Sequence, residues 1–128
     1  MNFDQLFENF GNIRIAVVGD VMLDTYWWGK VDRISPEAPV PVVAVSKKEQ
    51  RIGGAANVAL NLRSLGAKVS MISITGNDDD GKILKALLDD QHIDTRYLVQ
   101  SPGRITTNKI RIISRNQHMM RLDAEQVN

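Results

Sequence analysis

Two short apolar runs, each ending in a polar or glycine residue, constrain the fold of this chain most strongly. They are Ile13 to Val18, broken only by Arg14 and followed by Gly-Asp, and Val69 to Ile74, broken only by two serines and followed by Thr-Gly. Runs rich in apolar, β-branched residues are typical of strands buried on both faces, as in a parallel sheet. Apolar residues at helical spacing follow over residues 55–65 and 83–88. This alternation predicts an α/β layer built on a parallel sheet.

The remaining patterns predict a short helix and a second, smaller sheet. Phenylalanine and leucine recur at helical spacing over residues 2–10, and Gly11 ends that pattern. Residues 26–51 are rich in Val, Trp and Pro without a helical pattern, which predicts short or edge strands. The other predicted strands are residues 96–99, 105–113 and 117–123, with a hairpin turn at Arg115-Asn116 because Asn tolerates positive φ.

Composition narrows the function classes. Sixteen basic and fifteen acidic residues are interspersed, for a net charge of +1, which disfavours a nucleic-acid partner. The absence of cysteine excludes disulfides and thiolate sites, and the two isolated histidines predict no metal site. No apolar run is long enough for a membrane span and the N-terminus does not resemble a secretory signal, so we expect a cytoplasmic location.

Two aspartates follow the first apolar run. Asp20 and Asp24 lie where ligands bind in open α/β sheets, beyond the carboxyl end of a strand. Carboxylates there can accept hydrogen bonds from the hydroxyls of a sugar. The alternative is structural, with Asp20 capping a turn and Asp24 an ordinary surface acid.

A glycine pair opens the next helix. Gly53 and Gly54 let the backbone approach a ligand, and Asn57 in the first turn offers a donor and an acceptor. Neither the GxGxxG nor the P-loop nucleotide pattern is present. A tight strand-to-helix turn explains the same residues without any ligand.

Basic residues alternate along the last predicted hairpin. Lys109 and Arg111 share one face of their strand, and Arg121 lies on the next strand. Such a face suits a phosphate group, although a solvated sheet face has the same composition. The acidic run Asp78-Asp79-Asp80 lacks the ligand spacing of a calcium loop and is better explained as a helix N-terminal cap.

These motifs occur in an order that resembles the PfkB, or ribokinase-like, family of carbohydrate kinases. The resemblance rests on residues 53–59, Gly66 and residues 76–81, and covers nearly the whole chain. Residues 33–42 and 107–123 resemble, within that family, kinases of heptose 7-phosphate.

The resemblance implies a parallel-sheet Rossmann-type core with a β-sheet lid. The core would be residues 1–25 and 52–100, and the lid about 26–51 and 101–123. The implied reaction is transfer of the ATP γ-phosphoryl group, with Mg²⁺, to the anomeric hydroxyl of D-glycero-D-manno-heptose 7-phosphate, a step toward ADP-heptose and lipopolysaccharide. The implied sugar contacts are Asp20, Asp24, Gly53, Gly54 and Asn57, and the implied phosphate contacts are Arg33, Glu37, Lys109, Arg111 and Arg121.

One family signature is missing. No Gly-Ala-Gly-Asp stretch, which in the family holds the catalytic base and lies in the ATP-binding half, occurs here. We therefore assign no catalytic residue and expect this chain to bind no ATP or Mg²⁺ and to be inactive alone. An unpaired sheet edge and Trp27-Trp28 favour a homodimer or larger assembly. The alternatives are another sugar or nucleoside kinase of the family, or a non-catalytic sugar-phosphate-binding module.

Overall fold

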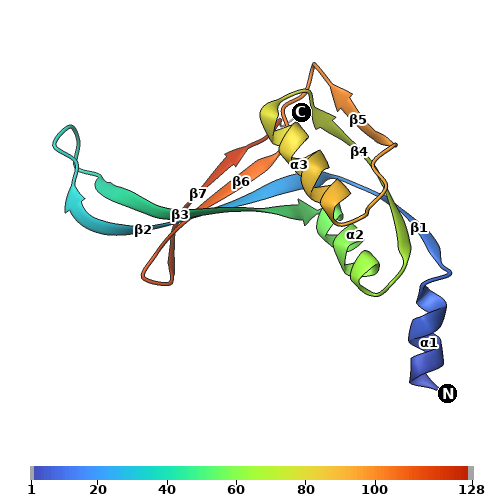
Figure 1. Cartoon of the computed structure of the whole chain (residues 1–128). Helices are drawn as coiled ribbons and strands as arrows, with labels where there is room; N and C mark the ends of the chain where they lie inside the picture. Colours follow the sequence, from blue (N-terminus) through green and yellow to red (C-terminus); the bar gives the residue numbers. More distant parts are fainter. Residues whose placement is uncertain (1, 127–128) are drawn as a thin grey trace.

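The computed structural model describes residues 2–126 and contains two sheets (Figure 1). The first is parallel, in the order β1-β4-β5, from Arg14–Val18, Lys68–Gly76 and Leu98–Ser101. Its helices are α2, Ala55–Ser64, and α3, Asp79–Asp90. The predicted parallel α/β layer is confirmed.

Only one face of this parallel sheet is covered. Val69 and Met71 of β4 are buried in one core cluster with Leu84 and Leu88 of α3. Side chains on the other face are open, and Val18 of β1 is 74% exposed. The prediction that the first apolar run is buried on both faces is therefore wrong within residues 2–126, because both helices pack on the same side.

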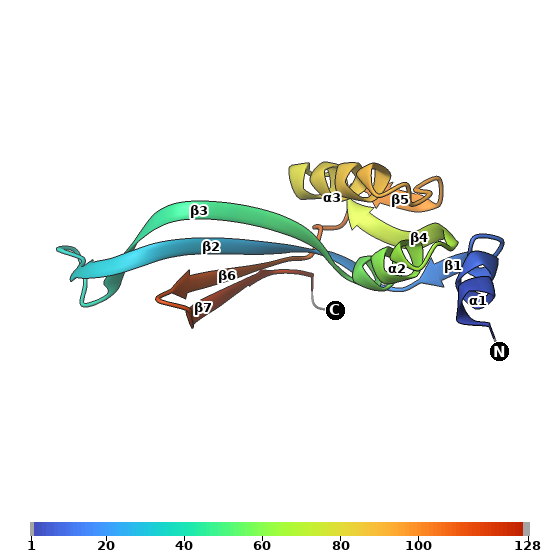
Figure 2. The ribbon, with the colours of Figure 1, turned by 60° about the horizontal axis from the view of Figure 1, so that its bottom comes forward.

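The second sheet is mixed, in the order β3-β2-β6-β7, and extends away from the helices (Figure 2). Its strands are β2 (Val21–Ile34), β3 (Pro41–Gly54), β6 (Asn108–Ser114) and β7 (Gln117–Ala124). We call this sheet the lid. β2 pairs antiparallel with β3 and parallel with β6, while β6 and β7 form an antiparallel hairpin.

The lid strands are longer than the sequence predicted. β2 and β3 have 14 residues each, whereas short strands were expected. Of the three prolines in residues 26–51, Pro36 and Pro39 fall between the strands. Pro41 is the first residue of β3, a place where a missing N–H breaks no ladder. The expected core–lid boundaries at residues 25 and 52 fall inside these two strands.

The lid shares its base with the core. Leu23 of β2 is fully buried and Ile52 of β3 nearly so, in the same cluster as Ala56 and Ala59 of α2. Burying an aliphatic side chain of this size contributes roughly 1.5–3 kcal/mol. The lid base is thus fixed by hydrophobic packing as well as by backbone pairing.

Local turn chemistry follows the sequence closely. Helix α1, Phe3–Phe10, ends at Gly11 as predicted, and none of its residues is buried. Gly66, with φ of 104°, terminates the α2 turn, and Arg115 and Asn116 have φ of 52° and 60° in the hairpin turn. The strand predicted over residues 96–99 begins later, as β5 at Leu98–Ser101, because the Leu98 N–H donates to the Thr95 carbonyl in a turn.

No helix within residues 2–126 is long and apolar enough to cross a bilayer.

Candidate functional site

An ion pair at the base of the lid joins two strands far apart in sequence. Nη1 of Arg111 on β6 lies 3.0 Å from Oδ1 of Asp24 on β2. Both side chains are about one-fifth exposed, at 21% and 19%. The parallel register sets Asp24 beside Lys109 and Tyr26 beside Arg111, so all four share one lid face.

Aromatic and cationic groups continue along this face. The Arg111 guanidinium lies 5.3 Å from the ring centroid of Tyr26, and that of Arg51 on β3 lies 4.6 Å from it. Arg51 Nε also donates to Glu49 at 2.8 Å, and this bond lowers the pKa of Glu49. Two guanidinium groups therefore contact one tyrosine ring beside a carboxylate.

A second group of charges lies on the neighbouring hairpin. Asp123 on β7 accepts from Lys109 Nζ at 3.2 Å and from Arg121 Nη2 at 3.0 Å. Loss of hydration would raise the pKa of Asp123, but these two bonds outweigh it and the pKa is lowered. Lys109, Arg111 and Arg121 are thus gathered on one lid face, each held by an acid.

The glycine pair next to this site is required by packing. A side chain at Gly53 would collide with the Asp24 carboxylate, and Gly54 has φ of 61°. The amide of Ala55 donates to the Asp20 carbonyl at 2.8 Å directly after the pair. Gly54 is the N-cap of α2 and supplies no side-chain cap, so the first turn of α2 is capped by no side chain from its N-cap residue.

The other predicted site residues are not brought to the ion pair. Asp20 lines a shallow apolar cavity on the open sheet face, and Asn57 lines another that it shares with Arg51. Arg33 pairs with Val42 near the far end of the lid, roughly 30 Å from Asp24 at 3.3 Å per residue. Glu37 lies in the loop beyond it.

The acidic run at the start of α3 does more than cap the helix. Asp78 is the N-cap and accepts from the Gly81 amide at 2.8 Å, as predicted. It also accepts from the Thr106 hydroxyl at 2.6 Å and the Thr106 amide at 2.8 Å. Burial raises the pKa of Asp78, but these hydrogen bonds outweigh it and the pKa is lowered. Asp78 therefore holds the chain that enters β6.

A buried relay completes this connection. Asp80 accepts from the Asn108 amide nitrogen at 3.0 Å, and Thr25 donates its hydroxyl to Asn108 Oδ1 at 2.8 Å. The sequence analysis missed this relay, and it also missed Tyr26 and Arg51. Strand alternation from Asp24 would have placed Tyr26 on its face, but the relay joins residues too far apart for any local pattern to reveal.

Metal ligation has no obvious place in the described part of the chain. Residues 2–126 contain no group of three or more His, Cys, Asp or Glu side chains arranged to hold an ion.

Comparison with known proteins places this arrangement in a family. The model of the pfkB family carbohydrate kinases matches residues 12–126. The bifunctional protein HldE of Geobacter sulfurreducens is 48% identical over 124 residues, covering 97% of this chain and 25% of that protein. The D-beta-D-heptose 7-phosphate kinase of Bordetella bronchiseptica is 49% identical over 119 residues, covering 93% and 38% respectively.

A solved structure shares the fold. An uncharacterized sugar kinase from Pyrococcus horikoshii, in complex with ATP, matches with a TM-score of 0.62 and 27% identity, over 88% of this chain and 34% of that one. The chain thus spans well under half the length of these proteins. The predicted core with a β-sheet lid is confirmed, and the chain belongs to the pfkB family of carbohydrate kinases.

Proposed function

We propose that this chain forms the sugar side and lid of an ATP-dependent kinase whose acceptor is D-glycero-D-manno-heptose 7-phosphate. The family match and the two heptose-related relatives support this substrate class. The observation that carries the proposal is the pair formed by Asp24 and Arg111, 3.0 Å apart on one lid face. The pair would place a carboxylate that accepts from sugar hydroxyls beside a guanidinium that binds phosphate.

The two side chains have complementary chemistry toward a sugar phosphate. A carboxylate accepts hydrogen bonds from sugar hydroxyls, and the Asp24 carboxylate occupies the space that a side chain at Gly53 would take. A guanidinium donates two parallel bonds to a phosphate group. A bound phosphate would draw the Arg111 guanidinium away from Asp24. The Asp24 carboxylate could then accept hydrogen bonds from sugar hydroxyls instead. Lys109 and Arg121 would add charge to the phosphate subsite.

The remaining assignments rest on the resemblance alone. Gly53 and Gly54 fit a close backbone approach at the start of α2. Asp20, Arg33 and Glu37 lie elsewhere in the described chain, and Asn57 shares a cavity with Arg51 but does not pair with Asp24, so their roles as substrate contacts depend on their match to the family pattern.

Phosphoryl transfer relies on position and on stabilisation of charge. In this proposal ATP supplies the phosphoryl group, with Mg²⁺ neutralising its phosphates, and the anomeric hydroxyl accepts it. Residues of this chain bind and orient the sugar, and the lid excludes water from it. None of them is assigned as catalytic base, so we expect the 128 residues alone to give no turnover.

The cellular setting follows from the same proposal. The product would lead toward ADP-heptose and lipopolysaccharide, in the cytoplasm where ATP is available. We expect no nucleic-acid or membrane partner. A homodimer or larger assembly would cover apolar side chains that are open here, such as Met120 at 57% exposure on β7.

Calorimetric titration of the 128-residue chain tests the substrate. We expect heptose 7-phosphate to bind about tenfold or more tightly than the unphosphorylated heptose, since a hydrogen bond to a charged group contributes roughly 1.5–3 kcal/mol. ATP should not bind. Asp24→Asn and Arg111→Gln should weaken binding of the sugar phosphate. The control Arg115→Gln, in the exposed hairpin turn, should leave that binding unchanged.

Three results would contradict the proposal. One is equal binding of both sugars, because the lid would then make no favourable contact with the phosphate group. Another is an equal effect of Arg111→Gln and Arg115→Gln, because non-specific charge would then explain the binding. The third is no binding of either sugar by the folded chain.

A further inference from the structure

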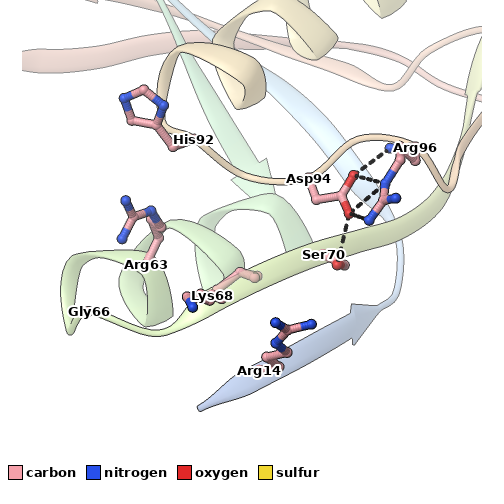
Figure 3. A pocket seen from close by; sticks show the side chains of 9 residues that line it. Arg14, Arg63, Gly66, Lys68, Ser70, His92, Asp94 and Arg96 are labelled. Atoms are coloured by element: carbon pink, nitrogen blue, oxygen red, sulfur yellow. Dashed lines mark hydrogen bonds and ion pairs between the residues drawn. The ribbon is translucent and has the colours of Figure 1, made fainter. Parts of the chain in front are cut away.

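A basic cavity lies at the amino ends of β1 and β4, at the opposite end of the parallel sheet from Gly19 and Gly76, where these strands lead toward the lid (Figure 3). It has a volume of about 350 Å³, and its side chains come from β1, β4, α2 and the segment after α3. Its charged or titratable lining residues are Arg14, Arg63, Lys68, His92, Asp94 and Arg96.

The only carboxylate in this lining is already occupied. Asp94 accepts from Arg96 Nη2 at 2.8 Å and Nε at 3.0 Å, and from the Ser70 hydroxyl at 3.3 Å. The side-chain hydrogen bonds from Arg96 lower the pKa of Asp94 to about 2, so the carboxylate stays charged and engaged near neutral pH. Both carboxylate oxygens already accept hydrogen bonds, so Asp94 forms no ion pair with the other cations of the lining.

Three cations therefore face the cavity without a partner. Arg14, Arg63 and Lys68 form no ion pair and no side-chain hydrogen bond anywhere in residues 2–126. In Figure 3 the interactions drawn all converge on Asp94, and none reaches these three side chains. Arg63 lies in the last turn of α2, where the helix dipole favours a cation, but the dipole does not account for the other two.

The strand register places two of these cations opposite each other. Arg14 and Lys68 are direct partners in the parallel pairing of β1 with β4. Like charges directly opposite each other on neighbouring strands destabilise a sheet. An anion between them would reverse the sign of that interaction.

We propose that this cavity binds a small phosphate-bearing metabolite. Guanidinium and ammonium groups are the side chains that bind phosphate best, and the volume suits a small phosphate ester. Gly66, with φ of 104°, forms part of the cavity wall between α2 and β4. This inference does not depend on the heptose substrate, because the cavity shares no residue with the lid face.

Nuclear magnetic resonance of the full 128-residue chain tests the site, with inorganic phosphate as the probe. We expect saturable shifts of the Gly66 and Ser70 amide signals, absent with sodium chloride at the same ionic strength. Arg63→Gln and Lys68→Gln should each lower the affinity for phosphate about tenfold, the loss typical of one charge-assisted hydrogen bond. Arg14→Gln is a third, independent variant.

The matched control is Lys82→Gln, an exposed cation on α3 without an ion pair in the described residues, which should leave phosphate binding unchanged. A dispersed spectrum for each variant confirms that it folds. Shifts that follow ionic strength alone, or that concentrate at Lys109 and Arg111, would overturn the proposal. So would equal weakening by Lys82→Gln, or binding restricted to a long polyanion such as heparin.

Discussion

Asp78 holds Thr106 through both of its carboxylate oxygens: Oδ1 accepts from the hydroxyl at 2.6 Å and Oδ2 from the amide at 2.8 Å. The same carboxylate caps α3 through the Gly81 amide. One side chain thus fixes both the start of a core helix and the entry of the chain into the lid.

Replacing this carboxylate should lower stability measurably. We expect Asp78→Ala to reduce the free energy of unfolding by about 2–3 kcal/mol, from the lost cap and the unsatisfied Thr106 groups. Urea denaturation followed by circular dichroism measures the change. Asp79→Ala is the control, since Asp79 is exposed and forms no side-chain hydrogen bond in residues 2–126, and it should change stability far less. Equal effects would show that general acidity of the first turn matters, rather than the Thr106 contact.

Acid should weaken the fold in part through Asp94 and Asp78. The pKa of Asp94 is lowered to about 2 by its bonds from Arg96, and that of Asp78 is lowered because its hydrogen bonds outweigh its burial. A carboxylate with a depressed folded-state pKa contributes stability that is complete above its unfolded pKa, about 3.9, and lost as pH falls through the folded value. The urea midpoint should therefore fall between about pH 4 and pH 2. Asp94→Asn should show a shallower fall over this window, and an unchanged slope would contradict the role of Asp94.

A methyl group at Gly53 should disturb the candidate site. Because the added Cβ would collide with the Asp24 carboxylate, Gly53→Ala should displace that carboxylate and cost about 1–3 kcal/mol of stability. Gly103→Ala is the matched control, because the nearest atom to its added Cβ is the Ser101 hydroxyl at 4.0 Å. Thermal unfolding compares the two. If Gly53→Ala were as stable as Gly103→Ala, Asp24 would not be held against the backbone as described.

Breaking the buried relay should loosen the lid at its base. Asn108 is 5% exposed and links the Thr25 hydroxyl to the Asp80 carboxylate. Asn108→Ala leaves both partners without their bond and should cost about 2 kcal/mol. Amide hydrogen exchange should quicken in β6 before it quickens in α2. The exposed Asn61→Ala in α2 should be neutral or slightly stabilising, since Ala is the better helix former.

Much of the local structure could be predicted from the sequence because its causes are local. Glycine after an apolar helix face predicts the ends of α1 and α2, and the tolerance of Asn for positive φ predicts the turn at Arg115-Asn116. The acidic cap of α3 is equally local. Each of these features depends on residues only a few positions apart, so the pattern contains the whole physical reason.

The candidate site could be predicted in composition but not in arrangement. Asp24 and Arg111 are 87 residues apart, and Asp78 and Thr106 are 28 apart, so no spacing rule links them. The register of β2 with β6 decides which charges meet, and a shift by one residue would turn Arg111 to the other face. The prediction that grouped Arg33 with Arg111 is untested as a statement about substrate, but within one chain these residues lie far apart along the lid.

The continuity of β2 determines how the lid can move. This strand passes from the packed base at Leu23 to the far end of the lid without a loop. Because no loop interrupts β2, the lid has no flexible hinge in this strand. Any change in the angle of the lid therefore requires bending of the paired strands. The register shifts at Trp28/Gly29 and at Val31/Arg33 interrupt the ladder and concentrate that bending. We therefore expect the lid to be stiffer near Asp24 than toward its tip.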